Sequence, residues 1–202
     1  MDVIVSHVNA DFDSLGALVG AGRLYPGAAL VLPGGEADGV REFRSLHATA
    51  IETHVVSDID PETITRVVVV DTNSRKRLGK AAAWLDLPGV EIHLYDHHTE
   101  SPGDLTPSRQ RVEAWGSAST ILTHLLIELG ETPTPIEATA LLLGIYADTG
   151  SLSFAGTVPE DLEAAAWLLR AGGDLEAVAE FTRQSLNPEQ RRLLRELLAA
   201  VE

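Results

Sequence analysis

The chain of 202 residues contains no cysteine and has few aromatic residues, which make up 5% of it. Without cysteine it can form neither disulfides nor thiolate metal sites, so a bound metal ion would depend on histidine and carboxylate. Basic residues are also scarce, since 15 Lys and Arg stand against 30 Asp and Glu, and the formal net charge is −15. Phosphate backbones and anionic lipids repel so negative a surface, which argues against a general nucleic-acid or membrane-surface binder.

The sequence has no apolar run of membrane-spanning length, and it does not begin with the basic and apolar segments of a secretory leader. A hydrophobic fraction of 45% and a charged fraction of 22% are near the averages for globular proteins. We therefore expect a cytoplasmic protein without a membrane partner. The length fits one large domain, or one domain with a helical extension.

Short β-branched segments alternate with helical segments in the first half of the chain. Strands are expected at residues 3–5, 29–32, 54–56, 66–71 and 91–96, and helices near 15–26, 40–47 and 78–87. Strands that alternate with helices form parallel sheets that are covered on both faces. The sequence thus predicts an α/β fold with a mainly parallel sheet of about five strands and helices on both faces.

The second half of the chain has the pattern of successive helices. They are expected at residues 117–129, 136–146, 159–170, 175–182 and 188–201. We interpret residues 1–155 as an α/β core and residues 156–202 as a helical extension that ends in a linker helix. The chain stops within that last, amphipathic helix without a stop signal, which indicates that a C-terminal substrate-binding domain is absent from it.

Carboxylate and imidazole side chains gather where the expected strands and one apolar helix end. These residues are His7, Asp11, Asp13, Asp71, Asp96, His97, His98 and Asp148. Singly they have ordinary alternatives, because an aspartate often caps a helix and a histidine pair is common on a surface. Adjacent parallel strands end at one edge of the sheet, however, so we expect these side chains to converge.

Converging carboxylates resist ionising together unless cations lie between them. Oxygen ligands combined with imidazoles suit Mn²⁺ or Mg²⁺, with Co²⁺ or Zn²⁺ as alternatives. The number of groups suffices for two divalent cations that share a bridging carboxylate. The sequence therefore predicts a site for two metal ions at the carboxyl ends of the strands.

Several segments, in this order, resemble the motifs of the DHH phosphoesterase superfamily: HVNADFDS, VVVVDTN, YDHH, GSAST and GIYADTG. The resemblance runs from residue 3 to about residue 155. That superfamily includes manganese-dependent inorganic pyrophosphatases, single-strand exonucleases, oligoribonuclease/pAp phosphatases and cyclic-dinucleotide phosphodiesterases. It also includes the N-terminal domains of multidomain bacterial tRNA nucleotidyltransferase/poly(A) polymerase proteins, and the DFDS form of the first motif looks most like that branch.

The resemblance implies a role for each residue of the predicted site. One metal ion would be bound by His7 and Asp11, the other by Asp13, His97 and Asp148, and Asp71 would bridge the two. His98 would face the substrate phosphate as a catalytic residue, and Asp96 would orient the histidine pair. The residue pattern by itself assigns these side chains to one site but does not distinguish His97 from His98.

Two further segments are candidates for contact with a substrate phosphate. Residues 116–120 open a helix whose free N–H groups could hold a phosphate oxygen, which makes Ser117 a candidate. An ordinary helix N-cap is the equal alternative for Ser117. The basic segment 75–80 includes Arg77, which the resemblance favours as a phosphate contact, and a solvated loop is the alternative.

The resemblance implies a two-metal-ion phosphoesterase that hydrolyses phosphodiester or phosphate-ester bonds of nucleotides or short RNA, with Mn²⁺ as the expected metal. It would be a module of a tRNA nucleotidyltransferase-type protein, with the fused nucleotidyltransferase or the absent C-terminal domain as its partner. Weak activity is expected of this chain alone, because the second wall of the site would be missing. The alternatives are a stand-alone oligoribonuclease or pAp phosphatase, and a metal-binding regulatory module without useful turnover.

Overall fold

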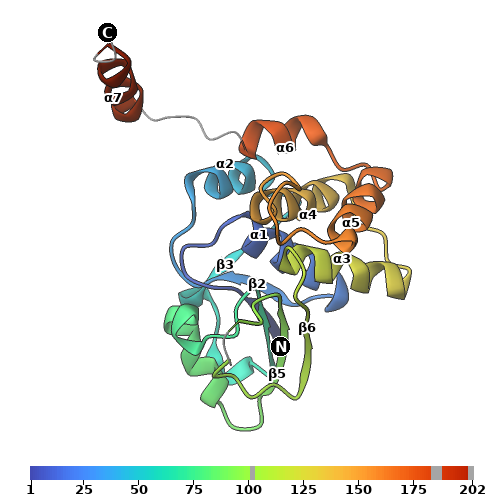
Figure 1. The fold of residues 1–202 in the computed structure, drawn as a ribbon. Helices are drawn as coiled ribbons and strands as arrows, with labels where there is room; N and C mark the ends of the chain where they lie inside the picture. The colour runs from blue at the N-terminus through green and yellow to red at the C-terminus, as the bar shows by residue number, and fades with distance from the viewer. Residues whose placement is uncertain (101–102, 183–187, 200–202) are drawn as a thin grey trace.

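The computed structural model describes residues 1–100, 103–182 and 188–199, and within them the chain forms a six-stranded sheet (Figure 1). The strands are β1 (Asp2–Val5), β2 (Ala29–Leu32), β3 (His54–Val55), β4 (Arg66–Val70), β5 (Glu91–Asp96) and β6 (Arg109–Val112). Every neighbouring pair is parallel, and the order across the sheet is β3-β2-β1-β4-β5-β6. The predicted α/β fold with a parallel sheet is confirmed.

Strand β6 is the element that the sequence pattern does not predict, and it raises the number of strands from the expected five to six. It lies at the edge of the sheet and pairs with β5. Its residues, Arg-Gln-Arg-Val, are exposed or half-buried. An edge strand that is not covered on both faces needs no continuous apolar run, so the pattern that marks the central strands is missing.

The α-helices agree closely with the sequence pattern. They are α1 (Phe12–Leu24), α2 (Asp38–Leu46), α3 (Ala118–Leu129), α4 (Pro135–Asp148), α5 (Pro159–Arg170), α6 (Leu175–Thr182) and α7 (Pro188–Ala199), with the short 3₁₀ turns η1 (Val56–Asp58) and η2 (Pro61–Thr63). The expected end of the last helix, at residues 200 and 201, lies outside the described residues. In the part of the chain that the structure describes, no helix is both long and apolar enough to cross a membrane.

The α-helix expected over residues 78–87 is instead part of a longer 3₁₀ segment, η3 (Arg75–Asp86). Gly79 interrupts this segment with a φ of 56°. The buried residues Leu78, Ala81 and Trp84 recur at every third position. That interval matches the three residues per turn of a 3₁₀-helix, whereas the turn of an α-helix would rotate them away from the sheet.

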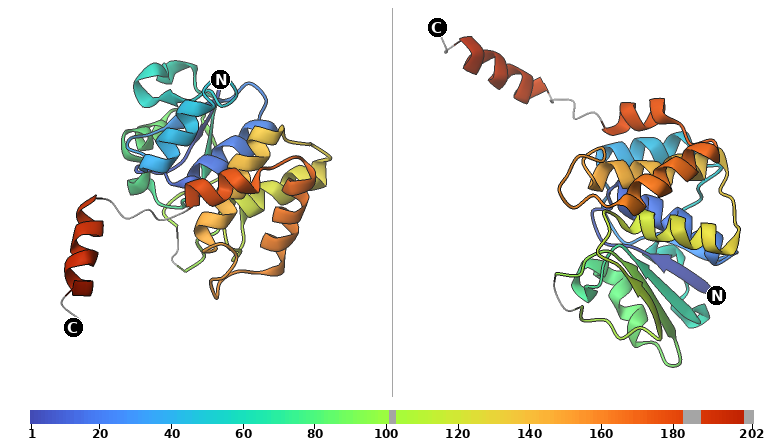
Figure 2. Two further views of the ribbon diagram at one scale, coloured as in Figure 1. Left: turned by 90° about the horizontal axis from the view of Figure 1, so that it is seen from above. Right: turned by 45° about the vertical axis from the view of Figure 1, so that its right-hand side comes forward.

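The central strands are apolar throughout because both faces of the sheet are covered. Ile4 and Val68 belong to the core on the side of the α-helices, whereas their neighbours Val67 and Val69 belong to the core on the side of η3. Figure 2 shows the α-helices on one side of the sheet and the green η3 segment on the other. This layering leaves the carboxyl ends of the strands as the edge where polar loops can meet.

The helices after residue 155 continue the core on the helical side. Ala164 and Leu168 of α5 and Val178 of α6 are buried in the same cluster as residues of α1 and α4. Helix α7 lies apart from this body in Figure 2, and its Leu197 is exposed. The division of the chain at residue 155 and the linker role of α7 stay predictions.

Helix α1 packs closely against α3 and α4, and Gly16 lies at the point of contact. A Cβ on Gly16 would overlap the Ser119 hydroxyl and lie 2.8 Å from the carbonyl oxygen of Ala140. We expect Gly16→Ala to lower the free energy of unfolding by about 1–3 kcal/mol, because the backbone of α4 would have to move. The control is Gly22→Ala in the same helix, whose Cβ would meet only the tip of the Leu30 side chain, at 3.2 Å. Urea denaturation of both variants measures the difference, and equal stabilities would contradict it.

Candidate metal centre

The predicted site residues come together at the carboxyl ends of β1, β4 and β5, which are neighbours in the sheet. The loops and ends of these strands provide His7, Asp71, Asp96, His97 and His98. Two helices complete the cluster, because α1 brings Asp11 and Asp13 at its start and α4 ends at Asp148. The six predicted metal ligands therefore lie close together.

Asp71 lies between two groups of potential ligands. Its Oδ2 is 3.3 Å from Nε2 of His7, and its Oδ1 is 3.5 Å from Nε2 of His97. Ligand atoms lie within 4.8 Å of one another in each of three sets: His7, Asp11 and Asp71; Asp13, His97 and Asp148; and Asp71, His97 and His98. One carboxylate that presents a different oxygen to each side has the arrangement required of a bridging ligand.

Each of the three histidines is held through Nδ1. Nδ1 of His7 donates to the carbonyl oxygen of Val8 at 2.8 Å, and Nδ1 of His97 donates to the carbonyl oxygen of Trp115 at 3.2 Å. Nδ1 of His98 donates to Oδ1 of Asp96 at 2.8 Å. A hydrogen bond at one ring nitrogen fixes the orientation of the ring and leaves the other nitrogen for a metal ion or a substrate. The cluster thus presents three Nε2 atoms.

The surroundings of His97 test whether a cation fits this cluster. Its Nε2 is buried and has no hydrogen-bond partner among the described residues. It lies 3.4–3.7 Å from carboxylate oxygens of Asp13, Asp71 and Asp148. A buried polar atom normally has a partner, and an imidazole nitrogen among carboxylate oxygens is a donor set for Mn²⁺ and similar ions. The residues therefore fit a divalent cation.

The cluster also shifts the pKa values of its members in the metal-free protein. Burial by itself lowers the pKa of His97, but the surrounding carboxylates, Asp71 first, outweigh it and raise this pKa to about 10. Burial, followed by the negative charges of Asp71 and Asp11, raises the pKa of Asp148 to about 6. A proton on His97 therefore takes the place that a cation would have between the carboxylates.

These pKa shifts predict that Mn²⁺ binding releases protons. Protonated His97 must lose its proton to become a ligand, and Asp148 becomes protonated as the pH falls through about 6, so the affinity should fall with decreasing pH. Titration calorimetry at pH 7.5 in two buffers of different ionisation enthalpy counts the protons released. We expect about one proton per chain to be released from His97. This proton should no longer be released in His97→Gln, whereas the control His54→Gln should still release it. Binding without proton release would contradict this arrangement.

The first three amides of α3 already have partners, two of them on Asp13, so these N–H groups are not free for a phosphate. The amide N–H groups of Ala118 and Ser119 donate to the two carboxylate oxygens of Asp13 at 2.7 and 2.8 Å. Ser117 is fully buried, and its hydroxyl oxygen accepts a hydrogen bond from the amide of Thr120 at 3.0 Å. The predicted phosphate contact of Ser117 is therefore wrong, and the alternative, a helix N-cap, is what the structure contains.

Ser14 belongs to the site although the sequence analysis does not single it out. Its hydroxyl donates to Oδ2 of Asp71 at 2.8 Å and lies 2.9 Å from Nε2 of His7. Ser14 is the last residue of the segment HVNADFDS, but a serine in the first turn of a helix does not by itself indicate a contact with a distant aspartate.

Asp71 itself has a φ of 60°, a left-handed conformation that few residues other than glycine adopt and that aspartate tolerates better than most.

The basic segment lies beside the first loop of the cluster. The carbonyl oxygen of Arg77 accepts a hydrogen bond from the amide of Val8 at 2.8 Å. Arg75 forms an ion pair with Asp86, whereas the guanidinium of Arg77 forms none within the described residues. The backbone of Arg77 thus lies beside the loop of His7, its guanidinium has no ion-pair partner in the part of the chain that the structure describes, and Arg77 stays a candidate for a phosphate contact.

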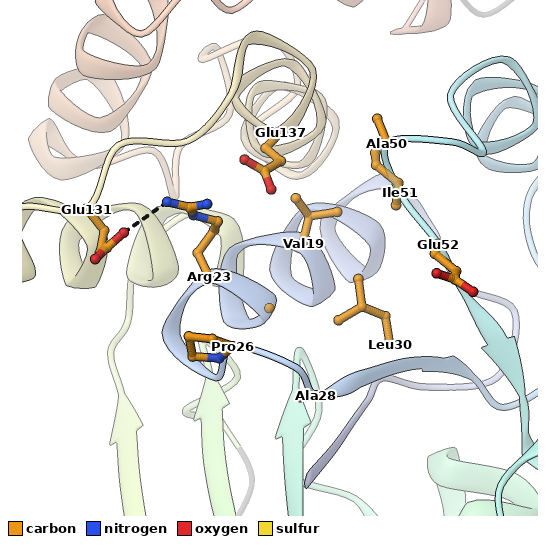
Figure 3. A pocket seen from close by; sticks show the side chains of 11 residues that line it. Val19, Arg23, Pro26, Ala28, Leu30, Ala50, Ile51, Glu52, Glu131 and Glu137 are labelled. Carbon is orange, nitrogen blue, oxygen red and sulfur yellow. Dashed lines mark hydrogen bonds and ion pairs between the residues drawn. The ribbon is translucent and has the colours of Figure 1, made fainter. Parts of the chain in front are cut away.

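A separate cavity of about 380 Å³ lies at the far end of α1 from the cluster (Figure 3). Val19 and Leu30 form part of its apolar wall, and Arg23 pairs with Glu131 across it at 2.9 Å. The residues that line it include no member of the cluster. This cavity is therefore separate from the candidate metal centre.

Comparisons with known proteins agree with the motifs and the fold. A family model described as the DHH family, N-terminal domain, matches residues 3–145. The chain is 46% identical over its whole length to the A-adding tRNA nucleotidyltransferase of Geobacter sulfurreducens, of which it spans 23%. A crystal structure of an exopolyphosphatase-related protein from Bacteroides fragilis superimposes with a TM-score of 0.81 and 19% identity, covering 98% of this chain and 60% of that one.

Two further relatives are each 30% identical to this chain. One is the bifunctional oligoribonuclease and PAP phosphatase NrnA of Thermus thermophilus, matched over 98% of this chain and 58% of that protein. The other is the probable manganese-dependent inorganic pyrophosphatase of Deinococcus radiodurans, matched over 89% of this chain and 57% of that protein. These relatives are all substantially longer than this chain.

Proposed function

This chain belongs to the DHH family, and from that premise we propose that it is a two-metal-ion phosphoesterase domain acting on phosphodiester or phosphate-ester bonds of nucleotides or short RNA. The observation that carries the proposal is the position of Asp71. Its two oxygens face the imidazoles of His7 and His97, which belong to different ligand groups. A single buried carboxylate between two such groups is suited to a pair of cations.

The residues on either side of Asp71 would hold the two cations. The first would be held by His7 and Asp11, and the second by Asp13, His97 and Asp148. Divalent cations at such a site polarise phosphoryl oxygens and lower the pKa of water towards neutrality. Mn²⁺ is our proposed metal because the donors are carboxylate oxygens and imidazole nitrogens, and because one relative is named as manganese-dependent; Mg²⁺ and Co²⁺ are the alternatives.

His98 would act on the substrate rather than on the metals. Its Nδ1–H donates to Asp96, which is fully buried, and its own side chain is 42% exposed. The same Asp96 oxygen accepts the amide of His97 at 3.0 Å, so one carboxylate positions both histidines. His98 can therefore hold a proton at Nε2 and donate it to a phosphate oxygen or to the leaving group. Arg77 would add positive charge on the side of the first loop.

The parent protein is part of this proposal. Because the chain spans 23% of its nucleotidyltransferase relative, we propose that it is the phosphoesterase module of a tRNA nucleotidyltransferase-type protein in the cytoplasm. The fused nucleotidyltransferase, or a C-terminal substrate-binding domain, would be its partner and supply the second wall of the site. The activity of this chain alone is then expected to be weak.

A substrate panel with Mn²⁺ tests the proposal. The panel contains bis-p-nitrophenyl phosphate, short RNA, pAp, cyclic dinucleotides and pyrophosphate, each with and without EDTA. Metal-dependent release of product from a nucleotide or RNA substrate supports a phosphoesterase, and efficient turnover of pAp and short RNA by this chain alone favours a stand-alone oligoribonuclease or pAp phosphatase. Binding of Mn²⁺ without turnover of any substrate would favour a regulatory module and contradict the proposed activity.

His98→Ala separates the catalytic role from metal binding. We expect kcat on the best substrate of the panel to fall about a hundredfold or more, because a positioned proton donor is lost. The metal content of the variant, measured by mass spectrometry, should equal that of the wild type. His54→Ala is the control for the loss of an imidazole outside the cluster. A parallel loss of metal from His98→Ala would show instead that His98 is a ligand.

A further inference from the structure

A cavity of about 320 Å³ opens directly beside the candidate metal centre. His97, His98 and Asp148 line it on the side of the cluster, and Trp115 and Phe154 are among the residues that complete its wall. Cavities that hold small ligands begin at about 300 Å³, so this one has room for one arm of a substrate whose phosphate lies at the cluster.

Phe154 is the exposed aromatic residue of this wall. Its side chain is 60% exposed, so most of the ring is open to a ligand in the cavity. One part of the ring packs on the backbone of Gly150, where a Cβ would overlap it. The ring is therefore supported from below while most of its surface stays open, as a stacking platform requires.

The turn that carries Phe154 is tightly constrained. Gly150, Ser151 and Leu152 all have left-handed φ values, of 56°, 58° and 63°. The amide of Phe154 donates to the carbonyl oxygen of Thr149 at 2.9 Å, next to the candidate ligand Asp148. A left-handed backbone is unfavourable for serine and leucine, and it persists only where the surrounding structure fixes it, often at functional sites. The turn thus fixes Phe154 relative to the metal centre.

His98 also borders a second cavity, of about 380 Å³, on the side of Asn73 and Gln110. The residues that line this second cavity include no Phe, Tyr or Trp. A phosphodiester at His98 would extend one arm into each cavity. Of these two cavities, the one lined by Phe154 has aromatic side chains on which a nucleobase could stack, and the other has none.

From these observations we propose that Phe154 is a specificity-determining residue whose ring stacks on a nucleobase of the substrate while the adjoining phosphate lies at His98 and Asp148. This inference rests on the proposed phosphoesterase function and adds a preference for substrates that carry a base over base-free phosphates. Stacking on an aromatic ring tolerates every base, so the preference is for a nucleoside rather than for a particular sequence.

Kinetics of Phe154 variants of the 202-residue chain test the inference. The substrates are the dinucleotide pApA and an abasic analogue in which each base is replaced by hydrogen. With Mn²⁺, Phe154→Ala should lower kcat/KM on pApA about tenfold, mainly through KM, and leave the abasic analogue unchanged. Phe154→Trp should retain the wild-type preference for pApA, whereas Phe154→Leu, which keeps an apolar side chain without a ring, should behave as the alanine variant.

Leu129→Ala is the matched control, because it removes an apolar side chain that is 65% exposed and lies outside both cavities. Equal kinetics of wild type and Phe154→Ala on pApA would overturn the stacking inference and leave the proposed function intact. If the wild type hydrolyses neither substrate, a fluorescence titration with 2-aminopurine riboside monophosphate decides the stacking, and the proposed function fails only if no member of the substrate panel is turned over either. Quenching by the wild type that is lost in Phe154→Ala supports stacking, whereas identical titrations, quenched or not, overturn it.

Discussion

Replacement of Asp71 by asparagine is expected to lower the Mn²⁺-dependent kcat/KM about a thousandfold or more, the largest effect of any single change in the site. Asparagine keeps the shape of the side chain and an oxygen that can accept the Ser14 hydroxyl, which lies 2.8 Å from Oδ2 of Asp71. It removes the negative charge that faces both His7 and His97. Both proposed cations lose a ligand at once, whereas loss of Asp11 or Asp148 removes a ligand from one.

The kinetics are measured on the best substrate of the panel, and bound metal is counted by mass spectrometry after gel filtration. Fewer than two ions per chain are expected in Asp71→Asn. Asp38→Asn is the matched control, because Asp38 is a carboxylate on the surface whose side chain is 98% exposed and pairs with Arg41. Unchanged metal content in Asp71→Asn would contradict the bridging role.

Replacement of Asp161 by alanine is expected to cause the largest loss of stability, about 3 kcal/mol or more. This aspartate is fully buried near the start of α5. Its carboxylate accepts hydrogen bonds from the Thr120 hydroxyl at 2.6 Å, from the amide of Val158 at 2.9 Å and from the amide of Gly116 at 3.1 Å. Alanine would leave these donors without their partner in the interior, where each loss costs about 1–3 kcal/mol.

Thermal unfolding followed by circular dichroism measures the effect, and a fall in Tm of about 6–12 °C corresponds to that loss in a chain of this size. Glu163→Ala is the control in the same helix, since Glu163 is an exposed carboxylate. A weaker affinity for Mn²⁺ is also expected in Asp161→Ala. Asp161 accepts from the amide of Gly116, which lies just before the α3 amides that donate to the candidate ligand Asp13, so its loss should disturb the position of Asp13. Equal stability of the two variants would show that the buried carboxylate contributes little.

The convergence of the candidate ligands was predictable because each of them lies next to a locally recognisable element. Asp71 directly follows β4, and His7 follows β1 with one residue between, and the apolar, β-branched residues of both strands are buried on both faces of the sheet. Parallel strands end at one edge, so the sequence order of strand and polar residue already implies that these side chains meet. Helix boundaries were predictable for the same local reason, as at Pro159 and Pro188, which each open a helix.

Three features were not predictable from local patterns. The 3₁₀ conformation of η3 depends on its packing against the sheet, because the same residues have the pattern of an α-helix in isolation. Strand β6 pairs at an edge, where the apolar signal is weak. The sequence pattern leaves the amides of Ala118 and Ser119 free for a phosphate, but both donate to Asp13, which comes from a distant part of the chain.

The sequence by itself determined the parallel α/β architecture, the donor types of the site and the absence of thiolate ligands, because these follow from composition and from periodicity within single elements. The tertiary structure alone decided that Asp71 directs one oxygen to His7 and the other to His97, and that Asp13 rests on the N-terminus of α3. The physical reason is distance along the chain. Asp13 and Ala118 are 105 residues apart, and the direction of a side chain across such a gap is set by how helices and strands pack.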